Sequence, residues 1–232
     1  MVHKKRVKNS KEKNLTREAY NDIRKMIFSN ELKPGQKIPY RRMADGLNMS
    51  LTPVVQALKH MEFMGLVCHE QNRGFFVENV TPQEIDEAYK LRIIIEPEML
   101  SHTILNIDEQ GIKTVGAALD EYLEACQKGS LKLKLVKDIQ FHMSMAELSG
   151  QKLSILILRY LFDFLYLRFG QELIFSRPSE DAADAHTAIF EAIKLKNVKK
   201  ATLVLEKHIK AIHKNALNGI QDRLSEMNDI VF

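Results

Sequence analysis

The chain is organised around one stretch in its second half, Val136-Lys137-Asp138-Ile139-Gln140-Phe141-His142-Met143. Asp138 and His142 lie four residues apart in a segment with helical periodicity, so both side chains project from one face. The same face carries Leu131, Leu135, Met145 and Ser149. This apolar character predicts burial, and burying a polar group without a partner costs about 1–3 kcal/mol. The carboxylate and the imidazole therefore need partners elsewhere in the fold.

Two later histidines occupy the same kind of position. His186 shares a helical face with Ala182, Ile189 and Ile193, and His208 shares one with Ala201, Val204, Leu205 and Ile212. A single buried histidine is usually a core residue with a satisfied hydrogen bond. Three imidazoles on three helices, joined by a carboxylate, instead predict one common site. Such a set of ligands suits Zn²⁺, Ni²⁺, Mn²⁺ or Fe²⁺.

Length and composition predict two globular domains in the cytoplasm. Two small domains fit 232 residues better than one large domain, and a hydrophobic fraction of 45% supports a full core. Cys68 and Cys126 are far apart and fit reduced packing residues better than a disulfide. No secretory signal is expected, because no apolar run follows the basic start. The most apolar segment, 153–169, carries three charged residues, which favours a buried helix over a membrane span.

The two halves of the chain differ in charge. Residues 1–78 hold 15 Lys and Arg against 8 Asp and Glu, a balance of +7, and residues 79–232 hold 19 against 22, a balance of −3. This division is typical of a nucleic-acid-binding head on a different kind of body. Part of the excess lies in a basic tail, 1–14, which can add phosphate contacts that do not depend on sequence.

Residues 15–80 predict a winged helix-turn-helix. Helical periodicity covers about 15–32, 40–47 and 50–64, with a Pro34-Gly35 turn after the first segment and Ser50 as N-cap of the third. Two β-like runs follow at 66–70 and 75–77, and the linker between them predicts a hairpin. In this plan the third helix enters the major groove, and the hairpin, or wing, reaches the neighbouring minor groove.

Residues 81–222 predict an all-α bundle. Thr81 is the expected N-cap at the domain boundary, with Glu84 in the first turn of the helix. Helical segments are expected near 82–106, 108–128, 131–149, 151–175, 179–196 and 198–222, followed by a tail at 223–232. The predicted fold class is therefore mainly α, with a winged head followed by a helical bundle.

The head also carries a set of recognisable motifs. They are Pro34-Gly35, Arg41, Met43-Ala44, Ser50-x-Thr52-Pro53-Val54, Ala57-Leu58, Met64-Gly65-Leu66-Val67 and Arg73-Gly74. In these motifs the head resembles the DNA-binding domain of GntR-type bacterial regulators. The resemblance implies that it binds double-stranded operator DNA through the second helix, the third helix and the wing. The implied contacts are Arg41, Arg42, Ser50, Leu51, Thr52, Val55, Gln56, Lys59, Arg73 and Gly74.

Three positions of the third helix depart from the family pattern. The family usually has arginine where this chain has Leu51 and Val55, and often glutamate where it has Gln56. Arginine on guanine is the commonest specific base contact, so two sources of guanine readout are missing. Leu51 and Val55 can instead pack on thymine methyl groups. We therefore predict half-sites richer in A·T pairs than those the family usually binds.

The bundle carries motifs of its own. They are Leu91-Arg92, Glu96-Pro97, Asp138-x-x-x-His142, Leu148-Ser149-Gly150, Ala185-His186-Thr187-Ala188-Ile189, Glu191-Ala192-Ile193 and His208-Ile209. In these the bundle resembles the FCD class of effector domains, the FadR-type branch of the same family. Many members hold a divalent metal with one Asp and three His, which implies Asp138, His142, His186 and His208 as ligands here. Members then bind a small carboxylate metabolite that fills open metal positions.

Arg92 is the leading candidate for contact with such a carboxylate. It falls on an apolar stripe of its helix, so we expect it to face inward and to meet an anion. Its partner is either Glu96, four residues on, or the carboxylate effector through bidentate pairing. Gln151, which stands where the family commonly has asparagine, and Arg159 and Arg168 complete the candidate effector contacts.

The favoured function is a cytoplasmic transcriptional regulator, not an enzyme, whose DNA binding responds to the metal-held metabolite. A homodimer is implied by the family plan. Two alternatives stay open: a metal-dependent enzyme built on the helical bundle, and a regulator whose back domain is a metal-free acyl-chain sensor.

Overall fold

The structure, a computed structural model, describes residues 2–29, 31–79, 81–174 and 182–229. Side chains are described at 14–27, 29, 31–79, 81–166 and 182–221. The chain divides into two compact units, residues 1–80 with 166–170, and residues 81–165 with 171–232.

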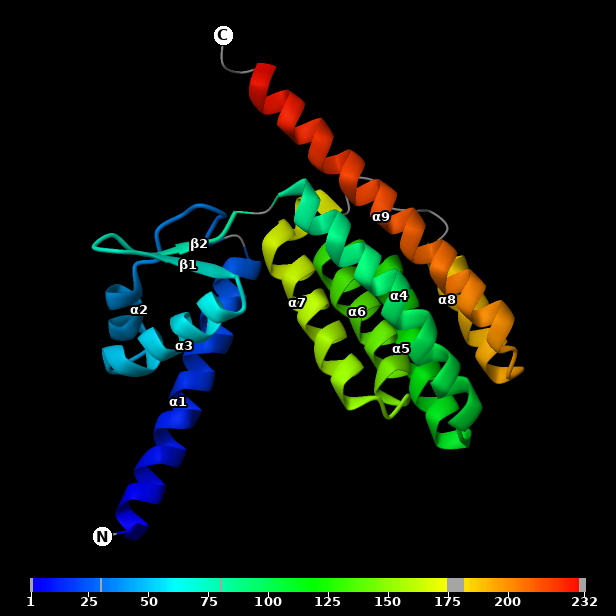
Figure 1. Cartoon of the computed structure of the whole chain (residues 1–232), viewed down its shortest axis with the longest axis horizontal. Helices are drawn as coiled ribbons and strands as arrows, with labels where there is room; N and C mark the ends of the chain where they lie inside the picture. Colours follow the sequence, from blue (N-terminus) through cyan, green and yellow to red (C-terminus); the bar gives the residue numbers. More distant parts are fainter. Residues whose placement is uncertain (1, 30, 80, 175–181, 230–232) are drawn as a thin grey trace. The chain divides into compact units, whose positions relative to one another are not determined.

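The first unit contains three helices and a hairpin (Figure 1). They are α1 (Val2–Phe28), α2 (Tyr40–Gly46), α3 (Leu51–Phe63), β1 (Val67–Glu70) and β2 (Gly74–Val77). The predicted order of elements is confirmed, but the expected boundaries of the first helix were wrong. It begins at Val2 instead of near residue 15, because the lysine-rich segment expected as a tail contains no Gly or Pro and favours helix.

The core of this unit lies between α1, α3 and the hairpin. Ala19, Ile23 and Ile27 recur at a spacing of four on α1, and all three are buried. They share the core with Val54, Ala57, Leu58 and Met61 of α3 and with Phe75 and Val77 of β2. Every second residue of β2 faces this core, which leaves the other face of the hairpin to solvent.

The hairpin is an antiparallel pair whose register runs from Val67 opposite Val77 to Glu70 opposite Gly74. Asn72 and Gly74 close it with positive φ angles of 62° and 101°. Lys37, just before α2, bridges to Phe76, so the segment before α2 lies beside the hairpin. This bridge brings the start of α2 close to the wing.

The second unit is a bundle of α4 (Pro82–Asn106), α5 (Glu109–Gln127), α6 (Leu131–Glu147), α7 (Lys152–Ile174), α8 (Ala182–Lys194) and α9 (Val198–Asp229) (Figure 1). The mainly helical fold class is confirmed. The last helix continues to Asp229, so most of the expected tail at 223–232 is helical. Leu131, expected on the buried stripe of α6, is exposed because it is the first residue of that helix.

The predicted N-cap at Thr81 is confirmed. The Thr81 hydroxyl accepts from the backbone N–H of Glu84 and the Glu84 carboxylate accepts from that of Thr81, a complete capping box. The Asp108 and Ser130 side chains each cap one helix with a single bond, accepting from the backbone N–H of Gly111 in α5 and of Leu133 in α6. These caps satisfy backbone donors that would otherwise lack partners at the helix starts.

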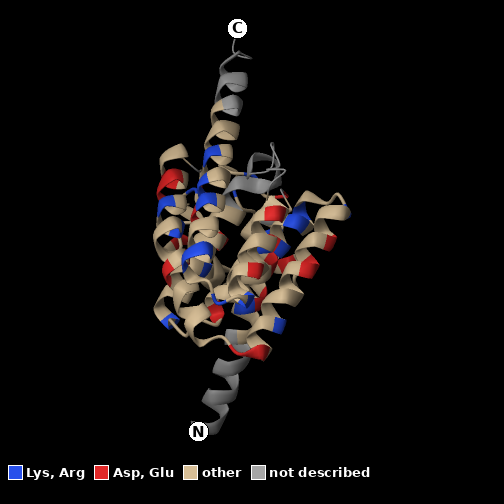
Figure 2. Ribbon diagram, turned by 90° about the vertical axis from the view of Figure 1, so that its right-hand side faces the viewer, with Lys and Arg blue, Asp and Glu red and all other residues tan. Residues whose placement is uncertain are grey.

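In the bundle, α9 packs along α4 and α8, and α5 packs against α6 and α8. This arrangement brings α6, α8 and α9 around a shared interior. On the side of the bundle that Figure 2 shows, Lys and Arg positions are interspersed with Asp and Glu positions along the helices. None of the helices in the described part of the chain combines the length and hydropathy that a membrane span requires.

Candidate functional site

Four polar side chains from three helices meet inside the bundle. Asp138 and His142 come from α6, His186 from α8 and His208 from α9, and all four are buried. Their ligand atoms lie within 4.8 Å of one another. His186 Nε2 is 2.9 Å from His208 Nε2 and 3.4 Å from Asp138 Oδ1. The helical spacings on α6, α8 and α9 therefore bring the four residues together as one cluster.

Two separations in this cluster, 2.9 Å from His186 to His208 and 3.4 Å from His186 to Asp138, match those around a metal ion. With metal–ligand bonds of about 2.1 Å, neighbouring ligands lie about 3.0 Å apart in octahedral geometry and about 3.4 Å apart in tetrahedral geometry. His142 Nε2 is buried and has no hydrogen-bond partner among the described residues. A buried acceptor nitrogen of this kind is costly unless a cation or a donor meets it. The cluster can therefore hold a divalent metal.

Electrostatics favour the uncharged imidazole, the form that binds metals, at His186 and His208. Burial, reinforced by His208 and His142, lowers the pKa of His186 well below its usual range. Burial and the charges of His142 and Arg92 do the same to the pKa of His208. Burial also raises the pKa of Asp138, and the nearby positive groups oppose this only in part. A bound cation would stabilise the Asp138 carboxylate and leave the imidazoles neutral.

A series of buried hydrogen bonds extends from His142 of the cluster to Glu96 and Arg92. His142 Nδ1 lies 2.5 Å from Glu96 Oε2, and Arg92 Nε donates to Glu96 Oε1 at 2.6 Å. Burial raises the pKa of Glu96, but the charges of Arg92 and His142 outweigh it and lower that pKa to about 2. Sequence reasoning considered Glu96 only as a partner of Arg92. Its bond to His142 spans 46 residues and joins two helices, so no local pattern signals it.

Arg92 contacts two aromatic rings in addition to Glu96. Its guanidinium carbon is 4.5 Å from the ring centre of Phe162 and 5.3 Å from that of Tyr89. Only 3% of Arg92 is exposed, and its Nη2 is buried without a hydrogen-bond partner among the described residues. The guanidinium thus donates to Glu96 through Nε, and its Nη2 remains available to donate to an anion.

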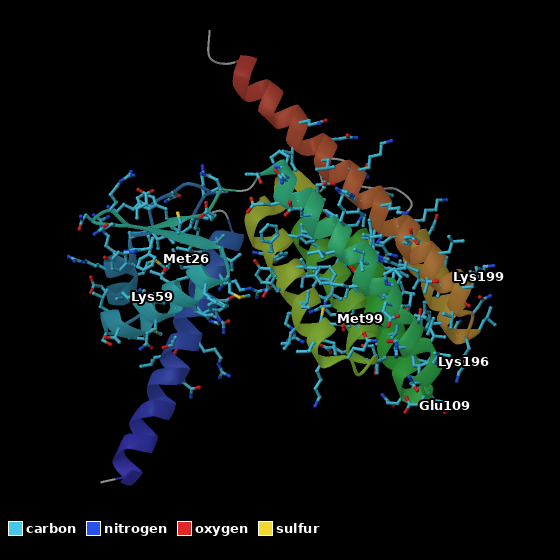
Figure 3. The ribbon with its side chains drawn as sticks, viewed as in Figure 1. Met26, Lys59, Met99, Glu109, Lys196 and Lys199 are labelled. Carbon is cyan, nitrogen blue, oxygen red and sulfur yellow. The ribbon has the colours of Figure 1, made fainter. Side chains whose placement is uncertain are left out.

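A small cavity adjoins the cluster. It holds about 10 Å³, roughly the space of one water molecule. Glu96 and His142 form its polar wall, and its apolar wall is formed by Met99, Leu100, Met145, Ala146, Leu158 and Leu205. Met99, labelled in Figure 3, belongs to α4. Methionine side chains adapt their shape readily, so this wall can repack around a guest.

Two other predicted effector contacts, Gln151 and Arg159, lie away from the cluster. Arg159 is exposed on α7 and pairs with Glu147 at 2.8 Å, so it does not line the cavity. Gln151 lies in the turn before α7, and its amide is 3.4 Å from Glu98 Oε1. The Arg168 side chain lies outside the described residues. Of the three predicted contacts whose side chains the structure describes, Arg92 is the one that lies beside the cluster.

On the head, the predicted DNA contacts of α3 form its outward face. Leu51, Thr52, Gln56 and Lys59 are exposed and Val55 is half-buried (Lys59 is labelled in Figure 3). Gln56 Oε1 accepts from Thr16 Oγ1 of α1 at 2.8 Å, which leaves the amide N–H groups of Gln56 for other partners. Ser50 precedes α3, but its side chain makes no capping hydrogen bond.

A basic hollow of about 680 Å³ lies between the start of α2 and the wing. Its lining includes Lys37, Tyr40, Arg41, Arg42, His69, Asn72, Arg73 and Gly74. Arg73 pairs with Glu70 of the hairpin and lies over the Phe76 ring, yet its side chain stays 68% exposed. Lys37 and His69 were missed as candidate contacts. The tertiary bridge from Lys37 to the wing is what adds them to this surface.

Comparison with known proteins supports the assignment of both domains. Residues 87–211 match the FCD domain, and residues 15–77 match the bacterial regulatory proteins of the gntR family. The HTH-type transcriptional regulator YdhC of Bacillus subtilis is 26% identical over 183 residues, covering 78% of this chain and 82% of that protein. McbR of Escherichia coli, also an HTH-type transcriptional regulator, is 24% identical over 159 residues, covering 68% and 70%.

Solved structures share the fold. The E. coli McbR/YncC structure superposes with a TM-score of 0.74 at 20% identity, covering 90% of this chain and 98% of that one. A GntR regulator from Rhodococcus sp. RHA1 gives 0.74 at 22% identity, covering 88% and 97%. With a winged head, a helical bundle and matches to both domains, this chain belongs to the GntR family of DNA-binding transcriptional regulators, in the group whose second domain is an FCD domain.

Proposed function

We propose that the bundle binds one divalent transition metal through Asp138, His142, His186 and His208, and that a small carboxylate metabolite then completes its coordination. The convergence of one carboxylate and three imidazoles within 4.8 Å is the observation that carries this proposal. Mixed nitrogen and oxygen ligands suit Zn²⁺, Ni²⁺, Mn²⁺ or Fe²⁺. The metal supplies a Lewis-acidic centre with open positions for an oxygen ligand.

Arg92 supports a carboxylate as the effector. Its buried, unpartnered Nη2 is a charged donor, and a carboxylate oxygen is the acceptor that pairs best with it. The adjoining cavity of about 10 Å³ is too small for a metabolite, so binding must move its walls. That requirement links effector binding to a change in the packing of α4, α6, α7 and α9, whose residues form those walls.

A homodimer is supported by exposed apolar side chains on two helices that share a core cluster. Met99 of α4 and Leu158 of α7 pack in one cluster, so these helices adjoin. Large apolar side chains are exposed on both: Leu91 and Ile94 on α4, and Leu153, Leu156 and Ile157 on α7. We call these five residues the α4–α7 face. A second copy of this chain is its proposed partner, because helix-turn-helix proteins commonly bind pseudo-palindromic operators as dimers.

Metal analysis of the purified protein tests the proposal most directly. We expect about one metal ion per chain, lost after chelation and regained on addition of Zn²⁺ or Ni²⁺. Protein that retains no metal and regains none would contradict the metal centre and favour a metal-free sensor. A gel shift on the chain's own promoter, run beside a turnover screen, separates the regulator from a metalloenzyme. Turnover without DNA retention would contradict the regulator.

A further inference from the structure

Glu96 is a buried charged group that metal ligation itself does not use. Its two carboxylate oxygens are both engaged, Oε1 by Arg92 Nε and Oε2 by His142 Nδ1. Only 4% of Glu96 is exposed. Arginine is always a donor, and the Glu96 carboxylate is an acceptor at both oxygens. In the series Arg92–Glu96–His142, the direction of each hydrogen bond is therefore determined by Arg92, which can only donate, and by the Glu96 carboxylate, which can only accept.

This pattern selects one tautomer of His142. Because Glu96 Oε2 can only accept, the neutral imidazole of His142 carries its proton on Nδ1 and leaves Nε2 with a lone pair. His142 Nε2 is buried and has no hydrogen-bond partner among the described residues, as expected for a nitrogen reserved for another ligand. A metal-binding histidine commonly donates its second nitrogen to a carboxylate in this way.

We propose that Glu96 is a positioning residue of the metal centre: it holds His142 in the tautomer that presents Nε2 to the metal, and Arg92 locks Glu96 in that role. The inference rests on the proposed metal centre. It also gives Arg92 two functions, since the same guanidinium that meets the effector carboxylate orients the group behind a metal ligand. Loss of Arg92 therefore affects metal binding even without effector.

The isosteric variant Glu96→Gln tests the role without changing side-chain volume. Arg92 Nε–H must still find an acceptor, so it takes the amide oxygen of the new glutamine. The amide NH₂ then faces His142 Nδ1 and can only donate, which moves the imidazole proton to Nε2. We expect the dissociation constant for Zn²⁺ to rise about 10–100-fold, as it does when other groups that hydrogen-bond to a metal ligand are removed.

A double variant, Arg92→Gln with Glu96→Gln, lets a bound metal reverse the direction of these hydrogen bonds, because a glutamine amide at position 92 can accept as well as donate. The Oε1 of glutamine at position 92 takes the place of Arg92 Nε and accepts from the amide at position 96. The amide oxygen at position 96 then faces His142 Nδ1 and accepts its proton again. We expect this variant to recover most of the Zn²⁺ affinity that the single variant loses. A general packing defect would instead worsen with the second substitution.

The tests use the full chain without effector, with Zn²⁺ affinity from chelator competition and the His142 tautomer from ¹⁵N NMR of the metal-free protein. Glu87→Gln, an exposed acid-to-amide change on the same helix, serves as the control and should bind Zn²⁺ as the wild type does. The inference predicts an Nδ1–H tautomer in the wild type and an Nε2–H tautomer in the single variant.

Several results would overturn it: an Nε2–H tautomer in the wild type, unchanged Zn²⁺ affinity in Glu96→Gln, or a folded double variant that binds no better than the single one. If the wild type binds no metal, the proposed metal centre itself fails, and the tautomer measurement still reports on Glu96 alone.

Discussion

At the scale of single residues, burial decides what each polar group of the bundle can do. His186 is fully buried, and its ring packs edge-on against Tyr122 at 4.4 Å between ring centres. His102, by contrast, has a side chain that is 47% exposed and lies 3.1 Å from Glu98 on the outside of α4. The two histidines share a residue type and differ in solvent access. Only the buried one gains a strong preference for a cation in place of water.

Replacing His208 by alanine should remove metal binding without unfolding the bundle. The change deletes one of three imidazole ligands. We therefore expect the Zn²⁺ dissociation constant to rise by at least about 100-fold, more than when a residue that only hydrogen-bonds to a ligand is lost. With Zn²⁺ at 100 times its dissociation constant, the wild type should gain about 2.7 kcal/mol, or roughly 5–10 °C in melting temperature. Thermal melts with and without Zn²⁺ measure both effects.

His102→Ala is the matched control, because it removes an exposed imidazole from the same bundle. It should keep the full Zn²⁺-dependent shift. A His208→Ala variant that retained this shift would contradict the assignment of His208 as a ligand.

At the scale of elements, each predicted function depends on one helix face or one turn. The outward face of α3 carries Leu51, Thr52 and Val55, while Val54, Ala57 and Leu58 face the core. The helical period separates these two sets, so the reading face can vary without disturbing the packing. The wing adds charge beside that face through the basic hollow at the start of α2.

Substituting arginine at both departing positions of α3, Leu51→Arg with Val55→Arg, should change which operators the head selects. Each bidentate contact of arginine with guanine is worth about 1–3 kcal/mol of discrimination. We expect the wild type to select half-sites rich in A·T pairs and the variant to shift toward guanine. Selection of bound oligonucleotides from a random pool measures this. Identical selected sites for the two proteins would contradict the role of these positions.

The basic hollow predicts a contact that α3 does not make. Lys37 lines it and bridges by its backbone to the wing, so we expect its ammonium group to meet a phosphate. Lys37→Ala should weaken binding to all sequences about equally and reduce the salt dependence of the affinity by about one counterion. Fluorescence anisotropy at several salt concentrations measures the slope. Lys113→Ala, on the exposed surface of α5, should leave it unchanged.

At the scale of the whole molecule, α4 follows the DNA-binding unit in sequence and carries the proposed effector contact. It begins at a capping box directly after the wing strand and carries Arg92 and Glu96 in its middle. An effector that meets Arg92 thus acts on the same rigid helix that follows the DNA-binding unit in sequence. A ligand shifts such an equilibrium only by its differential affinity, typically about 1–3 kcal/mol.

Charges placed on the α4–α7 face should separate the proposed dimer. Ile94→Glu with Leu156→Glu puts carboxylates at two positions that are 68% and 63% exposed in the single chain. We expect the dimer dissociation constant to rise at least about 30-fold, the equivalent of a contact worth about 2 kcal/mol. Analytical ultracentrifugation measures it. Leu203→Glu, at an equally exposed leucine of α9, should leave the dimer intact. A dimer that survives both charges would exclude this face.

The sequence alone determined the elements and their type. Helical and alternating periodicity, Pro34-Gly35, and the cap at Thr81 are local signals, and the structure confirms the winged head and the helical bundle that they predicted. The spacing of Asp138 and His142 also reported that both lie on one buried face, because four residues make about one helical turn. Where local signals were weak, as at the start of α1 and the end of α9, the expected boundaries were wrong.

Only the tertiary structure decided which distant groups meet. Glu96 reaches His142 across 46 residues, and Lys37 joins the wing through a single bridge. The tertiary structure also distinguishes two predicted effector contacts: Arg92 is buried beside the cluster, whereas Arg159 pairs with Glu147 at the surface. Helical period tells which residues share a face, but how helices pack determines what that face meets. Those contacts depend on how α4, α6, α8 and α9 fill a common core, which no short stretch of sequence contains.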